Sequence, residues 1–245
     1  MIVIIGDTHD DVLYFETVLA NKKEEILLNR FKVSIGTIFS QGVMVVSGMS
    51  TSILTSSVLT YILNNYYVDL VISVGKCLSA SEKAKPGNIA LCSEVIDVNV
   101  DLSTFKDVGL GEIPGFSREF LVQDDIFHYL AEALENRPNI DYNKSVYLST
   151  DNMSLDMVNY LKRNNGMFNR GNECFVIDNN SSGVAVACML KSVPFVVAKV
   201  IEYGLDQTQN LRTYTTVLKR YIDLGKGVIS TINSIGRSDI LEGGE

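Results

Sequence analysis

The sequence predicts a single α/β domain with a central twisted mixed β-sheet flanked by helices. Short, largely apolar runs at 1–6, 68–75 and 194–201 are typical of strands that are buried in a sheet with parallel pairing. Helical patterns separate these runs, so strands and helices alternate along the chain. No Gly/Ser-rich linker interrupts residues 1–245, and the four prolines are scattered, which favours one domain over two.

The first half of the chain is expected to supply most of the strands. Apolar residues recur at a spacing near four after residue 52, which is typical of a helix packed on a core. The expected elements are, in order, a strand at 1–6, a hairpin over 31–48 with its turn at Gln41-Gly42, a helix through 53–62, a strand at 68–75 and an extended segment at 87–100.

The second half is expected to alternate more regularly between helix and strand. Asp124-Asp125 can cap a helix that carries Ile126, Leu130 and Leu134. The elements expected after it are a strand at 144–150, a strand at 174–178, a helix through 184–189, a strand at 194–201 and a final helix through 211–222.

Composition excludes several classes of function. The net charge of −8 and the pI of about 4.9 argue against nucleic-acid binding, which needs a basic surface. No run approaches 18 apolar residues, and no basic segment precedes the first strand, so we expect a cytoplasmic protein without a membrane partner. Four cysteines without CxxC spacing and only two histidines, His9 and His128, argue against a metal site.

Three segments together resemble the nucleoside phosphorylase/nucleosidase superfamily, and the branch they resemble is 5′-methylthioadenosine/S-adenosylhomocysteine nucleosidase. The segments are "IIGDTHDDV" near the start, "VDLVISVGKCLSASEKAKPGNIAL" in the middle and "SVPFVVAKVIEYGLDQ" near the end, and "GEIPGF" at 111–116 is similar to a nucleosidase loop. The resemblance implies one domain over 1–245, a small purine nucleoside as ligand and no cofactor.

The resemblance also implies candidate catalytic residues. Cleaving a purine N-glycosidic bond needs an acid for the leaving base and a base that activates water. Asp11 stands at the water-activating Glu of the family, while Glu202 and Tyr203 stand at the Ser-Asp pair that supplies the acid. Asp206 matches a second Asp of that motif. Tyrosine is a poor acid at neutral pH, and strand alternation is expected to turn Glu202 to the opposite face.

The candidate binding residues follow from the same resemblance. The segment "IDNNS", which begins at Ile177, aligns with the ribose-binding V-E-M-E-A of the family, so Asn180 replaces the Glu that holds ribose hydroxyls and Asn179 replaces the Met that packs on the sugar. Met153 falls near the aromatic residue that stacks on adenine. Lys76 follows Gly75, where it could bind an anion or fill the pocket. The expected contacts are therefore Lys76, Met153, Ile177, Asn179, Asn180 and Tyr203.

Structural alternatives remain for these residues. Asp11 could lie in an exposed loop or cap a helix, Asn179 and Asn180 could cap the helix that follows them, and Lys76 could be solvated or paired with a carboxylate.

Three functions remain open. The chain could be a nucleosidase with impaired or altered chemistry, an inactive relative that binds a nucleoside or a protein, or a nucleoside phosphorylase. Asp10 stands where phosphorylases carry an Arg, which argues against phosphate binding. The segment 49–67, with many small residues and two adjacent tyrosines, predicts a homodimer interface.

Overall fold

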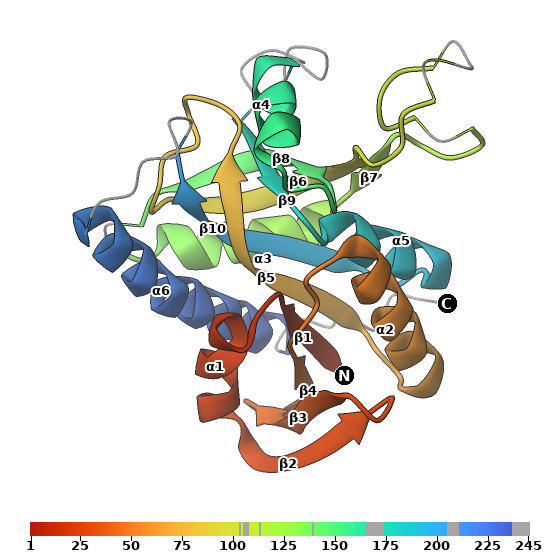
Figure 1. The fold of residues 1–245 in the computed structure, drawn as a ribbon. Helices are drawn as coiled ribbons and strands as arrows, with labels where there is room; N and C mark the ends of the chain where they lie inside the picture. The colour runs from red at the N-terminus through yellow and green to blue at the C-terminus, as the bar shows by residue number, and fades with distance from the viewer. Residues whose placement is uncertain are drawn as a thin grey trace.

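The computed structural model describes residues 1–102, 104, 108–112, 114–138, 140–164, 174–204 and 211–236, with the backbone alone for 211–214. Within these ranges a ten-stranded mixed sheet is flanked by helices (Figure 1), which confirms the predicted α/β fold. The strands are β1 (Ile2–Gly6), β2 (Ala20–Leu27), β3 (Phe31–Ile38), β4 (Gln41–Val46), β5 (Leu70–Ser79), β6 (Ile89–Asp97), β7 (Glu119–Leu121), β8 (Tyr142–Ser149), β9 (Cys174–Asp178) and β10 (Phe195–Tyr203).

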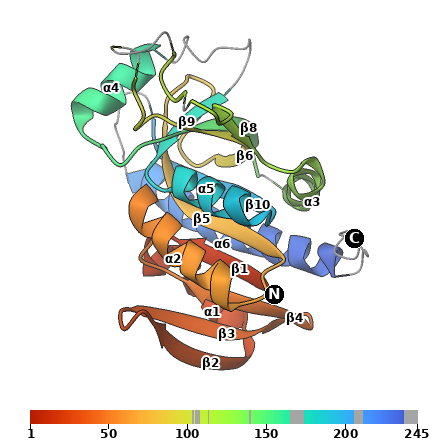
Figure 2. The same cartoon turned by 90° about the vertical axis from the view of Figure 1, so that its right-hand side faces the viewer.

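Helices cover both sides of this sheet. They are α1 (His9–Val18), α2 (Ser52–Asn65), α3 (Asp124–Glu135), α4 (Leu155–Asn164), α5 (Ser181–Lys191) and α6 (Leu211–Ile235). Figures 1 and 2 show α2 and α5 side by side on one side of the sheet, with α1, α3 and α6 on the other. Gly183 allows the close approach of α5 to α2, because a Cβ there would lie 2.2 Å from the Ser52 carbonyl oxygen.

The apolar runs became the centre of the sheet. Strand β1 is buried along its whole length, and residues Phe195 to Ile201 of β10 are all buried. Both strands pair in parallel with β5, as strands buried on both faces do. The strand order in the sheet is β10-β6-β8-β9-β5-β1-β4-β3-β2. Because β10 also pairs with β5, five strands form a closed ring of pairings: β5, β9, β8, β6 and β10.

The parallel pairing brings the carboxyl ends of three strands to one edge of the sheet. Gly6 at the end of β1 lies opposite Val74, and Ile201 near the end of β10 lies opposite Cys77. The end of β9 meets the same part of β5, where Ile177 pairs with Leu78. Ligands of open α/β sheets bind at such strand ends.

Two local predictions in the first half of the chain need correction. The hairpin at 31–48 forms, but its turn is Phe39-Ser40, with φ of 48° and 75°, and Gln41 already opens β4. Two successive residues with positive φ match the right-handed twist of a two-residue hairpin, even without glycine. Strand β2 was not predicted; it is an exposed edge strand in which half of the residues are charged and no alternation of buried residues occurs.

No helix in the described part of the chain is both long enough and apolar enough to cross a membrane.

Candidate functional site

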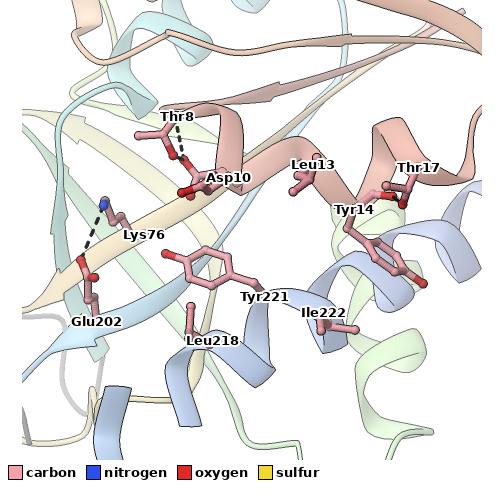
Figure 3. A pocket seen from close by; sticks show the side chains of 11 residues that line it. Thr8, Asp10, Leu13, Tyr14, Thr17, Lys76, Glu202, Leu218, Tyr221 and Ile222 are labelled. Carbon is pink, nitrogen blue, oxygen red and sulfur yellow. Dashed lines mark hydrogen bonds and ion pairs between the residues drawn. The ribbon is translucent and has the colours of Figure 1, made fainter. Parts of the chain in front are cut away.

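Two connected cavities open at the carboxyl ends of β1, β5, β9 and β10. The smaller, of about 180 Å³, is lined by Asp7, Thr8, Ser50, Lys76, Cys77, Leu78, Met153, Ile177, Asn179 and Glu202. The larger, of about 490 Å³, lies between α1 and α6 and shares Thr8, Lys76 and Glu202 with the smaller (Figure 3). The volume of the larger cavity falls within the range of roughly 300–1,000 Å³ that is usual for ligand pockets.

The structure brings most of the expected site residues together. Lys76, Met153, Ile177, Asn179 and Glu202 line the smaller cavity. They come from four separate segments of the chain that the fold brings to one cavity.

Two expected residues line neither cavity, and a third is not among the described residues. Asn180 is fully buried and lines neither cavity, and Tyr203 is partly buried and lines neither. Asp206 lies outside the described residues.

Glu202 points into the site, and the expectation that strand alternation turns it away is wrong. The register between β10 and β5 shifts between Ile201 and Tyr203, which pair with the consecutive residues Cys77 and Leu78. This bulge adds one residue to β10 and changes the side-chain alternation at that point. Glu202 Oε2 consequently lies 3.9 Å from Lys76 Nζ (Figure 3).

Asp11 caps the first turn of α1 and also lines the larger cavity. Its Oδ2 accepts hydrogen bonds from the backbone N–H of Thr8 at 2.7 Å and from the Thr8 hydroxyl at 2.8 Å. The bond from the Thr8 backbone, together with the bond that the Thr8 side chain accepts from the Asp11 backbone N–H, forms a capping box at the first turn of α1. The Asp11 side chain is nevertheless among those that line the larger cavity, where it lies with Lys76 and Glu202.

A buried polar cluster lies directly beneath the smaller cavity. Lys199 is fully buried, and its Nζ lies 2.8 Å from Asp178 Oδ2, 3.3 Å from Asp7 Oδ1 and 2.6 Å from Asn180 Oδ1. The Asn180 amide nitrogen donates to Asp7 Oδ1 and to the Met49 carbonyl oxygen. Both the oxygen and the nitrogen of the Asn180 amide are therefore hydrogen-bonded within the protein.

Burial dominates the electrostatics of this cluster. It raises the pKa of Asp7 to about 6, although the Lys199 ammonium acts in the opposite direction, and the charges of Asp178 and Asp11 add to the rise. Burial lowers the pKa of Lys199, but Asp178 and Asp7 outweigh it and hold that pKa above its usual value. Lys199 therefore stays charged, while Asp7 titrates close to physiological pH.

Sequence reasoning missed Asp7 and Lys199 as members of the site. A lysine in the otherwise apolar run "FVVAKVI" was the available signal, because a buried ammonium requires a carboxylate partner. Asp7, directly after the first strand, was the nearest candidate by position. Within the described residues no group of three or more His, Cys, Asp or Glu side chains could hold a metal ion.

Comparison with known proteins places this chain in a family. The family model of the phosphorylase superfamily matches residues 1–232. The 5′-methylthioadenosine/S-adenosylhomocysteine nucleosidase of Buchnera aphidicola subsp. Acyrthosiphon pisum (strain APS) is 26% identical over 190 residues, which are 76% of each chain. The nucleosidase of Exiguobacterium sp. (strain ATCC BAA-1283 / AT1b) is 22% identical over 152 residues, which are 62% of this chain and 63% of the relative.

Solved structures show the same fold at low sequence identity. The nucleosidase of Neisseria meningitidis in complex with methylthio-immucillin-A has a TM-score of 0.81 and 14% identity, covering 96% of this chain and 99% of that one. A nucleosidase-like protein of Borrelia burgdorferi B31 bound to adenine has a TM-score of 0.80 and 20% identity, covering 96% and 100%. The futalosine hydrolase of Helicobacter pylori strain 26695 has a TM-score of 0.80 and 17% identity, covering 96% and 97%. The chain is a member of the phosphorylase superfamily.

Proposed function

We propose that this chain binds a purine nucleoside at the carboxyl ends of β1, β5, β9 and β10 and hydrolyses its N-glycosidic bond slowly or not at all. The nucleosidase relatives and the neighbours bound to adenine or to a nucleoside analogue support the ligand class. The two connected cavities at the strand ends support a binding role.

The Lys76–Glu202 ion pair is the main observation that supports slow or absent hydrolysis. Glu202 is the carboxylate of β10 that lines the cavities in the described part of the chain. An acid that protonates the leaving base must itself hold a proton, and a proton on Glu202 would remove its attraction to the Lys76 ammonium 3.9 Å away. The position that the family resemblance gives to the acid holds Tyr203, and tyrosine is a poor acid at neutral pH.

A base-release assay tests the proposal. The protein is incubated with adenosine, inosine and 5′-methylthioadenosine, each with and without phosphate, and free base is quantified while binding is followed by calorimetry. We expect saturable binding and a turnover well below the roughly 1–10³ per second usual for enzymes, because loss of one general acid costs about 10²–10⁴ in rate. Efficient turnover of any of the three nucleosides would contradict the proposal.

Restoring an acid at position 203 should raise the rate. Tyr203→Asp places a carboxyl group at the position that the resemblance gives to the acid. We expect the rate of base release from methylthioadenosine to rise at least about tenfold, which is less than the full rate contribution of a general acid. Tyr203→Phe is the matched control and should leave the rate unchanged. Equal rates in the two variants would show that a carboxyl group at position 203 does not act on the bound nucleoside.

A phosphorylase is the second candidate, and Lys76 is the observation that favours it. This lysine lines both cavities and is 44% exposed, so it is accessible to an anion. Faster base release with phosphate than without it would support this reading. The same rate in both arms would favour water as the nucleophile or the absence of catalysis.

We also propose that the protein is cytoplasmic and forms a homodimer through the segment 49–67. In this segment Ile53 is 74% exposed and Tyr67 is 85% exposed, and Tyr61 is exposed as well, which suits a self-complementary interface. Light scattering at micromolar concentration should give the mass of two chains. A mass of 27.1 kDa would contradict the dimer.

A further inference from the structure

Asp7 is a buried carboxylate that reaches the smaller cavity from the end of β1. Its side chain is 6% exposed, and that exposed part belongs to the cavity wall formed with Ser50, Cys77 and Asn179. Gly75 makes room for it, because a Cβ at that position would lie 3.3 Å from the Asp7 carboxylate atoms. The fold therefore holds a carboxylate against the cavity at a position that neither the sequence motifs nor the family resemblance assigned.

The contacts of Asp7 leave part of its acceptor capacity for a ligand. The described residues give Oδ1 two donors, the Asn180 amide and the Lys199 ammonium at 3.3 Å, and they give Oδ2 the Lys199 ammonium at 3.4 Å. A carboxylate offers about four acceptor sites, so Oδ2 retains one. The donor that uses it must come from the side of the cavity.

The charges around Asp7 determine which kind of ligand group can donate a hydrogen bond to its carboxylate. Lys199 lies within 3.4 Å of both carboxylate oxygens and would repel a cationic ligand group. Asp7 and Asp178 would repel an anionic one. A neutral hydroxyl avoids both penalties and can form a charge-assisted hydrogen bond to the carboxylate.

We propose that Asp7 accepts a hydrogen bond from a ribosyl hydroxyl of the bound nucleoside, and that Asn180 and Lys199 are positioning residues that act through Asp7. This inference rests on the proposed function. It moves the hydroxyl-binding role from Asn180, whose amide is used inside the protein, to a carboxylate beside it. Asp7, which directly follows β1, supplies the negative charge that Asn180 lacks.

The protonation state of Asp7 should make the affinity for the ligand depend on pH. A residue with a purely structural role would not produce this dependence. Burial raises the pKa of Asp7 to about 6, so ligand binding should weaken as the pH falls below that value and the carboxylate is neutralised. The titratable and charged groups that act on Asp7 from the surrounding elements are Lys199 of β10, Asp178 of β9, Asp11 of α1, Cys77 of β5 and Tyr221 of α6.

Two ligands and two variants test the inference. Adenosine and 2′,3′-dideoxyadenosine are titrated into the full-length protein by calorimetry at pH 7.5 and pH 5. At pH 7.5 the wild type should bind adenosine at least about tenfold more tightly, as expected for a hydrogen bond to a charged group. In Asp7→Asn this ratio should fall to about threefold and become independent of pH. The control is Asp125→Asn, an exposed carboxylate on α3 that lines neither cavity, and it should match the wild type.

The outcomes separate this inference from the proposed function. If the wild type binds neither nucleoside, the proposed function fails, and the inference fails with it. If the wild type binds both nucleosides equally at pH 7.5, or shows the same ratio at pH 5, the inference alone is overturned. The pH series on the wild type needs no variant, so it decides the matter even if Asp7→Asn does not fold.

Discussion

Replacing Lys199 by methionine is expected to lower the free energy of unfolding by about 3–5 kcal/mol, the usual cost of breaking a buried ion pair by removing one partner. Lys199 is fully buried and is the cation that balances Asp7 and Asp178, whose nearest oxygens lie 3.3 and 2.8 Å from Nζ. Methionine has a similar length but no charge, so two carboxylates would remain buried without compensation. Urea denaturation at pH 7.5 measures the change.

A surface lysine provides the matched control for this variant. Lys32 Nζ lies 2.9 Å from Glu24 Oε2, but both side chains are exposed, so Lys32→Met should leave the free energy of unfolding almost unchanged. Similar losses in the two variants would show that Lys199 does not hold the carboxylates in place.

The second large effect is a pH-dependent stability difference between the wild type and Asp7→Asn. The folded-state pKa of Asp7, about 6, lies above the ordinary value of 3.8 for an aspartate, so folding favours the protonated form. This contribution to stability is present below pH 3.8 and is lost as the pH rises through about 6. Asparagine resembles the protonated carboxyl at every pH. Relative to the wild type, Asp7→Asn should therefore gain roughly 3 kcal/mol between pH 4 and pH 7.5.

Urea denaturation of both proteins across this pH range measures the difference, and Asp125→Asn again serves as the control. A constant offset between Asp7→Asn and the wild type would contradict the raised pKa. A variant that loses stability relative to the wild type as the pH rises would show that ionised Asp7 stabilises the fold, through its pairing with Lys199.

The scaffold was predictable because its signals are local. The apolar runs at 1–6 and 194–201 became the central strands β1 and β10, and the spacing of apolar residues after residue 52 became α2. The edge strand β2 carries no such signal, because an exposed and charged segment gains its structure from pairing with β3.

The site was only partly predictable because it depends on features that span the fold. The position of Glu202 depends on a register shift against β5, which strand alternation cannot reveal. The role of Asn180 depends on Asp7 and Lys199, which lie 173 and 19 positions away in the chain. Alignment with a family motif assigns a role to a position, but the partners of that position decide whether the side chain is free to perform it.

Stoichiometric binding and base release measured in one mixture test the central claim most directly. Methylthioadenosine is mixed with an excess of protein, and bound nucleoside and free adenine are quantified from the same sample over time. The account predicts that the nucleoside is bound and remains largely intact over many seconds. Conversion at the roughly 1–10³ per second usual for enzymes would contradict the proposal of impaired chemistry. If Glu202→Gln abolished this conversion, Glu202 would be the acid.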